Sequence, residues 1–168
     1  LLGRMTLEEK VGQMNQHLAG WEAYTGSRGS LQISDAFKEA VEEVGMGFVY
    51  GLFRADPWPG VTLENGARPA EGARLANELQ RYVIEHTRLG IPLLFSEECP
   101  HGHMAIDGTV FPSPITLAGT WEPELARKMG RIAASEIRAR GAHIGYGPIL
   151  DIAQDPRWSR VEETYGED

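Results

Sequence analysis

Cysteine and long apolar runs are both scarce in this sequence of 168 residues. Cys99 is the single cysteine, which excludes an internal disulfide and any metal site built from several thiolates. The uninterrupted apolar stretches are only a few residues long, whereas a membrane-spanning helix needs about 20. We therefore expect a chain that does not cross a bilayer.

Basic residues are also in short supply. Sixteen lysines and arginines stand against 24 acidic residues, which gives a formal net charge of -8. A field of this sign repels phosphate backbones and anionic lipid surfaces, so we expect neither nucleic acid nor membrane as a partner. The hydrophobic content of 42% and charged content of 24% are typical of a globular domain. The chain starts at Leu1 without a methionine and stops on an acidic run at Asp168, so we expect both ends to be cut and leave localisation open.

Apolar spacing and cap residues predict four helices. The first begins with a capping box at Thr6–Glu9 and carries an apolar stripe of Leu7, Val11, Met14 and Leu18. The second has Ser34 as its cap, an apolar face of Phe37, Val41 and Val44, and a stop at Gly45. The third covers residues 70–89, and the fourth covers residues 123–140 and ends at Gly141.

Three apolar, β-prone segments separate these helices. They cover residues 47–53 (GFVYGLF), 91–95 (IPLLF) and 142–152 (AHIGYGPILDI). The first of them lacks alternation, as expected of a parallel strand covered on both faces. Strand and helix alternate along the chain, which predicts an α/β fold with a parallel sheet. Residues 54–69 are rich in proline and glycine and predict a long loop.

Polar residues gather where these strands end, which is where parallel α/β folds bind ligands. The clusters are Ser96-Glu97-Glu98-Cys99-Pro100-His101-Gly102-His103 after the second strand, Asp151 in the third, and Asp155-Pro156-Arg157-Trp158-Ser159-Arg160 with Glu162 and Glu163 behind it. Trp58 lies in the long loop. Carboxylates, guanidinium groups and an indole on one rim suit a neutral polyhydroxylated ligand.

Each cluster also has a plainer interpretation. Glu97 and Glu98 fit a solvated strand end, and Trp58 fits a plug in its loop. Two histidines, His101 and His103, resemble metal ligands, but a third spaced ligand is missing, so hydrogen bonds to the backbone are favoured. Cys99 fits a small half-buried residue better than a nucleophile. The segment 157–160 fits ion pairs with its acidic neighbours.

Five blocks of the sequence carry a resemblance to a known family. They are LGRMTLEEKVGQMNQ (2–16), RLGIPLLFSEECPHGHM (88–104), TVFP (109–112), TWEPEL (120–125) and GPILDIAQDPRWSRVEETYGED (147–168). Together and in this order they resemble the amino-terminal barrel domain of glycoside hydrolase family 3. The resemblance extends over nearly the whole chain, and its last block is long and specific.

The resemblance implies an exo-acting, retaining β-glycosidase, most often a β-glucosidase that hydrolyses terminal non-reducing β-D-glucosyl residues. It also implies that residues 1–168 are a partial amino-terminal domain: the first three strands of a (β/α)8 TIM-like barrel, truncated at the C-terminal end. The family's nucleophilic Asp and its acid/base come later than Asp168, so no catalytic residue is assigned here. The family needs no organic cofactor or metal, and it somewhat favours a periplasmic or secreted location.

The residues that carry over from the family bind the sugar. Glu98 stands where the family places an acidic residue, commonly Asp, that receives sugar hydroxyls, and Arg160 matches an Arg that donates to them. Ser159 replaces the usual Gly before this arginine. The supporting positions are His101, Asp151, Arg157 and Glu163. The expected partner is therefore a small carbohydrate, a β-glucoside or an oligosaccharide.

Three rivals remain open. A β-xylosidase of the same family is the first, and a non-catalytic sugar-binding relative that keeps Glu98 and Arg160 is the second. A metal-dependent hydrolase that uses His101, His103 and Glu98 is the third. For the isolated chain we expect no activity and poor solubility, because parallel strands that do not close a barrel leave an edge free for intermolecular pairing.

Overall fold

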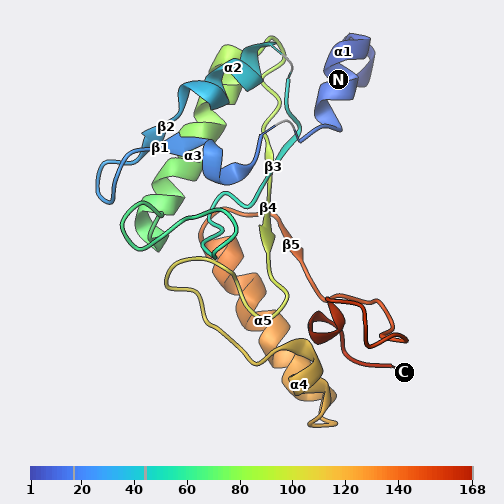
Figure 1. Ribbon diagram of the computed structural model, residues 1–168. Coiled ribbons are helices and arrows are strands. Elements are labelled where there is room, and N and C mark those ends of the chain that lie inside the picture. The colour runs from blue at the N-terminus through green and yellow to red at the C-terminus, as the bar shows by residue number, and fades with distance from the viewer. Residues whose placement is uncertain (17, 44, 168) are drawn as a thin grey trace.

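The computed structural model describes residues 1–16, 18–43 and 45–167 (Figure 1). Its elements are α1 (Leu7–Gln13), β1 (Tyr24–Thr25), β2 (Gln32–Ile33), α2 (Asp35–Glu43), β3 (Phe48–Tyr50), α3 (Pro69–His86), β4 (Leu94–Glu98), α4 (Pro114–Ala118), α5 (Pro123–Ala139) and β5 (Ile144–Tyr146), with short 3-10 turns at Leu2–Arg4, Gly20–Glu22 and Val161–Glu163. None of the helices in this part of the chain combines the length and apolar content that a bilayer crossing requires.

The central sheet is parallel, as the alternation of strands and helices predicts. Its order is β3-β4-β5, with Phe48 paired to Leu94 and Ser96 paired to Ile144. Strands β1 and β2 form a separate antiparallel ribbon. The α/β class is therefore confirmed, and the carboxyl ends of β3, β4 and β5 point the same way.

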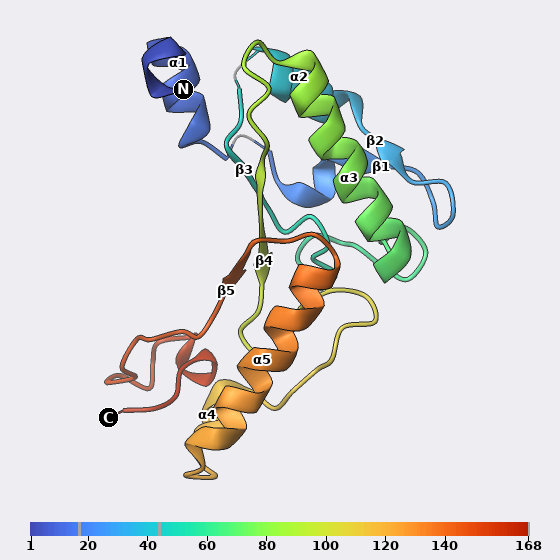
Figure 2. The same ribbon diagram turned by 180° about the vertical axis from the view of Figure 1, so that it is seen from behind.

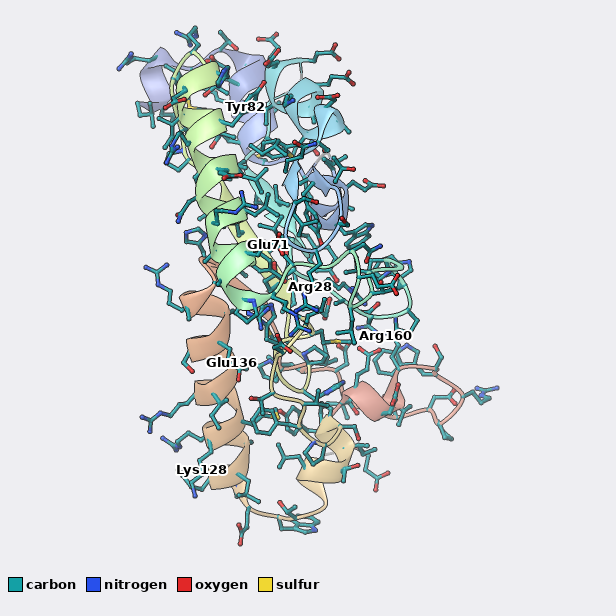
Figure 3. The ribbon with its side chains drawn as sticks, turned by 90° about the vertical axis from the view of Figure 1, so that its left-hand side faces the viewer. Arg28, Glu71, Tyr82, Lys128, Glu136 and Arg160 are labelled. Atoms are coloured by element: carbon teal, nitrogen blue, oxygen red, sulfur yellow. The ribbon has the colours of Figure 1, made fainter. Side chains whose placement is uncertain are left out.

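The two long helices connect the strands of this sheet. Helix α3 runs between β3 and β4, and α5 runs between β4 and β5. Figures 1 and 2 show α2 beside α3 at one end of the molecule and α5 with α4 at the other. In Figure 3, α3 and α5 follow one another along one side of the molecule, and Arg160 lies on the opposite side. Helices α3 and α5 thus lie on the side of the molecule away from Arg160.

The hydrophobic core lies between α2, α3 and the sheet. Phe37 of α2, Leu79 of α3 and Phe95 of β4 are all fully buried in it. Helix α2 begins as predicted, because the Ser34 Oγ accepts the Phe37 N–H at 3.1 Å. Its predicted stop at Gly45 is also confirmed by a left-handed φ of 75°. Val44, predicted to share the apolar face, lies outside the described residues.

The capping box of α1 is confirmed. The Thr6 Oγ1 accepts the Glu9 N–H at 3.2 Å, and the Glu9 carboxylate accepts the Thr6 N–H at 2.8 Å. Three members of the predicted apolar stripe, Leu7, Val11 and Met14, are exposed. The fourth, Leu18, lies beyond the end of α1 and packs partly buried against the core. In Figure 1 this helix stands apart from the other elements.

The first and third strands are shorter than predicted, and the second keeps its predicted length but is shifted along the chain. Strand β4 begins at Leu94 instead of Ile91, because the Gln80 side chain bonds both the N–H and the C=O of Leu93, at 2.9 and 2.7 Å. Glu97 and Glu98 consequently lie inside the strand and not behind it. Strand β3 ends before Gly51, whose φ is 70°. Strand β5 starts later than predicted because the Ala142 N–H still bonds the carbonyl of α5 residue Ile137, at 3.0 Å.

Candidate functional site

A cavity of about 480 Å³ opens at the carboxyl ends of β3 and β4. The polar and aromatic side chains that line it include Tyr50, Arg54, Trp58, Glu98, His101, Arg160, Glu162 and Glu163. These residues come from four separate segments: the end of β3, the loop 54–68, the end of β4 and the C-terminal segment. The two predicted sugar-binding residues, Glu98 and Arg160, thus face one space although 62 positions separate them.

Glu98 is the last residue of β4 and is held by two donors. Its Oε2 accepts a hydrogen bond from the Tyr50 hydroxyl and lies 3.3 Å from Nη1 of Arg54. Arg54 also donates to the Tyr50 hydroxyl oxygen. Burial and the bond to Glu98 raise the pKa of Tyr50, so the phenol keeps its proton and donates. The second oxygen of Glu98 is thereby left to accept hydroxyl groups of a ligand.

Trp58 supplies an aromatic surface at the rim of this cavity. The Arg54 guanidinium lies 4.5 Å from the centre of its ring, and the Trp21 ring lies 5.5 Å from it. These contacts hold the indole at one side, yet 69% of the residue stays exposed. Of the two interpretations of Trp58, a plug in its own loop and a platform for a ligand, the exposure favours the platform, since a plug would be buried.

Arg160 reaches the cavity from the C-terminal segment (Figure 3). Its Nε donates to one oxygen of Glu163 at 2.8 Å, and its Nη2 donates to the other oxygen at 2.5 Å. This bidentate ion pair lowers the pKa of Glu163 and raises the pKa of Arg160. The charges of Glu98 and Asp151 add a smaller upward effect on the pKa of Arg160. A cation is therefore fixed opposite the carboxylate of Glu98.

The other predicted supporting residues lie around this site. His101 lines the cavity, and its charge helps to lower the pKa of Glu163. Asp151 is exposed and contributes only its charge near Arg160. Arg157 forms a two-pronged pair with Asp155, with contacts of 2.6 to 3.1 Å, at the exposed tip of the segment. Their supporting roles stay predictions.

The thiol and the second histidine lie away from the ligand space. Burial, followed by the charges of Glu97 and Glu98, raises the pKa of Cys99 to about 12, so the thiol is protonated at neutral pH and a poor nucleophile. His103 is buried and faces Glu97 at 3.1 Å. Within residues 1–16, 18–43 and 45–167, no group of three histidine, cysteine or acidic side chains comes close enough to hold a metal ion.

Two site residues escaped the sequence reasoning. Tyr50 reads only as one more β-prone residue in an apolar strand, and Arg54 as the first residue of a long loop. Arg54 directly follows the expected strand 47–53, and this position is the signal that points to it, since such strand ends carry the ligand groups in α/β folds. Tyr50 lies inside the expected strand and has no such signal.

A parallel sheet with helices on one face, and a polar cavity at its carboxyl edge, are features of carbohydrate-processing α/β enzymes as well as of other classes. The sequence decides between them. The family described as the N-terminal domain of glycosyl hydrolase family 3 matches residues 6–168, and the chain belongs to this family.

Curated relatives carry glucosidase and xylosidase names. A periplasmic β-glucosidase of Salmonella typhimurium is 31% identical over the whole chain, which covers 18% of that protein. A β-xylosidase of Formosa agariphila is 46% identical over 97 residues, which make up 54% of this chain and 13% of that protein. The chain thus spans a fifth or less of the length of these relatives.

The chain is also similar in structure to two solved β-glucosidases. The β-glucosidase EmGH1 of Erythrobacter marinus has a TM-score of 0.75 and 33% identity, with 99% of this chain and 20% of that chain covered. A β-glucosidase of Listeria innocua in complex with isofagomine has a TM-score of 0.70 and 32% identity, with 99% and 19% covered.

Proposed function

We propose that this chain forms the sugar-binding part of an exo-acting, retaining β-glycosidase, and that a terminal β-D-glucosyl residue is its preferred ligand. Its three parallel strands are then the first three of a (β/α)8 barrel. The nucleophile and the acid/base belong to other parts of the same protein, and a retaining enzyme holds these two carboxylates about 5 to 5.5 Å apart. The chain presented here contributes the groups that hold the glycosyl ring.

One observation carries this proposal: Glu98 and Arg160 face the same cavity and are each fixed by a partner. The free oxygen of Glu98 accepts sugar hydroxyls, and the N–H groups of Arg160 that Glu163 does not occupy donate to them. The exposed face of Trp58 covers an apolar ring surface or the aglycone. Contacts of this kind that tighten as the ring approaches the oxocarbenium-like state accelerate the reaction as well as binding.

A β-xylosidase is the second candidate, and the Formosa agariphila relative favours it. Xylose lacks the hydroxymethyl group of glucose, so the two sugars differ in one polar group and a small volume. The network of Tyr50, Arg54 and Glu98 serves the ring hydroxyls that both sugars share. The choice therefore depends on the walls of the cavity that other segments of the protein supply.

The test uses the full-length protein that carries this chain, with 4-nitrophenyl β-glucoside and 4-nitrophenyl β-xyloside as substrates. We expect hydrolysis of the glucoside with the β-anomer released first, as seen by proton NMR. The variants Glu98→Ala and Arg160→Ala are expected to lower kcat/KM by about 10- to 100-fold, because each removes a charged hydrogen-bond partner of the sugar.

The matched control is Arg127→Ala on the exposed surface of α5. Among the residues that the structure describes, Arg127 pairs only with Glu124, at 3.1 Å. Its kcat/KM is expected to stay unchanged. Faster hydrolysis of the xyloside would select the second candidate. Sugar binding without hydrolysis would select the non-catalytic relative, and unchanged kinetics in both site variants would refute the proposed binding role.

A further inference from the structure

Glu97 is a carboxyl group with no contact with solvent. Its exposed fraction is 0%, whereas the adjacent Glu98 lines the cavity. Successive residues of a strand point to opposite faces, so the two side chains serve different spaces. Burial raises the pKa of Glu97, which reflects the cost of placing a carboxylate in the interior. The proposed function gives this costly group no task.

The contacts of Glu97 show what holds it there. The Phe53 N–H donates to its two oxygens at 3.2 and 3.4 Å, and Nε2 of His103 lies 3.1 Å from Oε2. Nδ1 of His103 is buried and finds no partner within the described part of the chain, so the ring hydrogen belongs on Nε2, directed at the carboxylate. The buried Arg140 opposes the upward shift in the pKa of Glu97 through its charge.

These contacts connect the segments that form the sugar site. Phe53 directly precedes Arg54, and Glu97 directly precedes Glu98. His103 belongs to the loop that also presents His101 to the cavity. The Glu97 carboxylate thus bonds the backbone directly next to Arg54, whose Nη1 lies 3.3 Å from Oε2 of Glu98.

We propose that Glu97 is a positioning residue for sugar binding: through Phe53 and His103 it ties the end of β3 to β4 and to the loop behind it, and so sets Arg54 against Glu98. This inference rests on the proposed function. Glu97 touches no ligand and acts only through the residues it holds.

The experiment compares three variants in the full-length protein. Glu97→Gln keeps the shape but turns one acceptor oxygen into a donor, and Glu97→Ala removes both acceptors. The matched control is Ser96→Ala. Ser96 is equally buried in β4 and bonds the Val49 carbonyl at 3.2 Å, but it makes no side-chain bond to the segment 53–54. Calorimetry gives the Kd of isofagomine, and thermal melting gives the loss of stability.

We expect both Glu97 variants to raise the Kd of isofagomine and the KM of the aryl glucoside by about tenfold, with alanine at least as severe as glutamine. Ser96→Ala is expected to lower Tm and leave the Kd unchanged. A lower Tm with an unchanged Kd in Glu97→Gln would show a purely structural role and overturn the proposal. If Glu97→Ala does not fold, Glu97→Gln decides.

Hydrogen exchange at the Phe53 amide separates this inference from the function on which it rests. Faster exchange of the Phe53 amide in Glu97→Gln than in Ser96→Ala supports the proposal that the Glu97 carboxylate fixes Phe53, in any folded form of the protein. Equal exchange in the two variants overturns it. A wild-type protein that fails to bind isofagomine would refute the sugar-binding function, and the exchange rates would still decide whether Glu97 fixes the end of β3.

Discussion

The pairing of Arg160 with Glu163 prepares this arginine before a sugar arrives. A guanidinium has five N–H donors, and Glu163 engages Nε and one donor of Nη2. The remaining donors stay available in a fixed plane, so less side-chain entropy is lost when a ligand binds. Glu163 therefore acts on affinity by holding Arg160 in place.

This pairing makes a pH-dependent prediction. Because Arg160 lowers the pKa of Glu163 in the folded protein, the pair stabilises the fold fully above the ordinary glutamate pKa of about 4.3. That contribution is lost as the pH falls through the lowered folded-state value. A carbon NMR titration of the Glu163 carboxyl is expected to give a midpoint below that of a glutamate in the unfolded chain. An equal or higher midpoint, or an unchanged midpoint in Arg160→Ala, would contradict it.

Individual site residues differ in how far the sequence reveals them. Glu98 and Arg160 stand in specific blocks, so a resemblance locates them. Tyr50 and Arg54 act through a network with Glu98, and the sequence does not show which residues 44 and 48 positions away will bond to it. The burial of Glu97 follows from where β4 starts, which in turn depends on Gln80 of α3.

Helix α5 has an N-cap residue, Glu122, that does not satisfy the amides of its first turn. Pro123 occupies its first turn as predicted, but the Glu122 cap makes no side-chain hydrogen bond to the helix. Its longer side chain suits the cap position less well than aspartate or asparagine does. The first turn of α5 therefore keeps N–H groups that no side chain of the cap satisfies.

Replacing this cap is expected to stabilise the start of α5. Glu122→Asp should slow hydrogen exchange at the Glu124 amide by an amount equivalent to about 0.5 to 1 kcal/mol, whereas the Leu125 N–H already donates to the Glu122 carbonyl at 3.0 Å. The control is Glu85→Asp, which makes the same chemical change at an exposed position inside α3 and should instead weaken that helix slightly. Unchanged exchange in Glu122→Asp would show that the cap position is already satisfied.

Elements were predicted well where local signals suffice. The capping box at Thr6, the Ser34 cap and the glycine stop at Gly45 depend on neighbours within a few positions, and all three are confirmed. Strand ends depend on partners far away in the sequence. Gln80 delays β4 and the Ile137 carbonyl delays β5, and neither effect is visible in the apolar pattern.

The described molecule has an open sheet. Strand β5 pairs with β4 along one edge only, and β3 lies at the other edge. Apolar side chains in and after β5 are exposed: Ile144, Tyr146, Leu150 and Ile152. Open parallel edges with exposed apolar residues favour pairing between chains. At the scale of the whole molecule, the three-stranded sheet of the described residues is therefore open at its β5 edge.

We therefore expect the isolated 168-residue chain to self-associate and not to hydrolyse aryl β-glucosides. Light scattering after size-exclusion chromatography measures the first, and release of 4-nitrophenol measures the second. The double variant Leu150→Lys with Ile152→Lys should reduce association, whereas Val110→Lys, at an equally exposed site in another loop, should not. A monomeric wild-type chain, or hydrolysis abolished by Glu98→Ala, would contradict these expectations.

The register of the sheet has a consequence for how fast the chain folds. Phe48 meets Leu94 and Ser96 meets Ile144, so each strand pair joins residues 46 and 48 positions apart. The chain must lose the conformational entropy of the loop between two parallel strands before the hydrogen bonds between those strands can form. This cost slows folding relative to proteins rich in local contacts. Helices α3 and α5 shorten these loops once they form. We therefore expect mutations that weaken either helix to slow the formation of the sheet, because they lengthen the loops that must close.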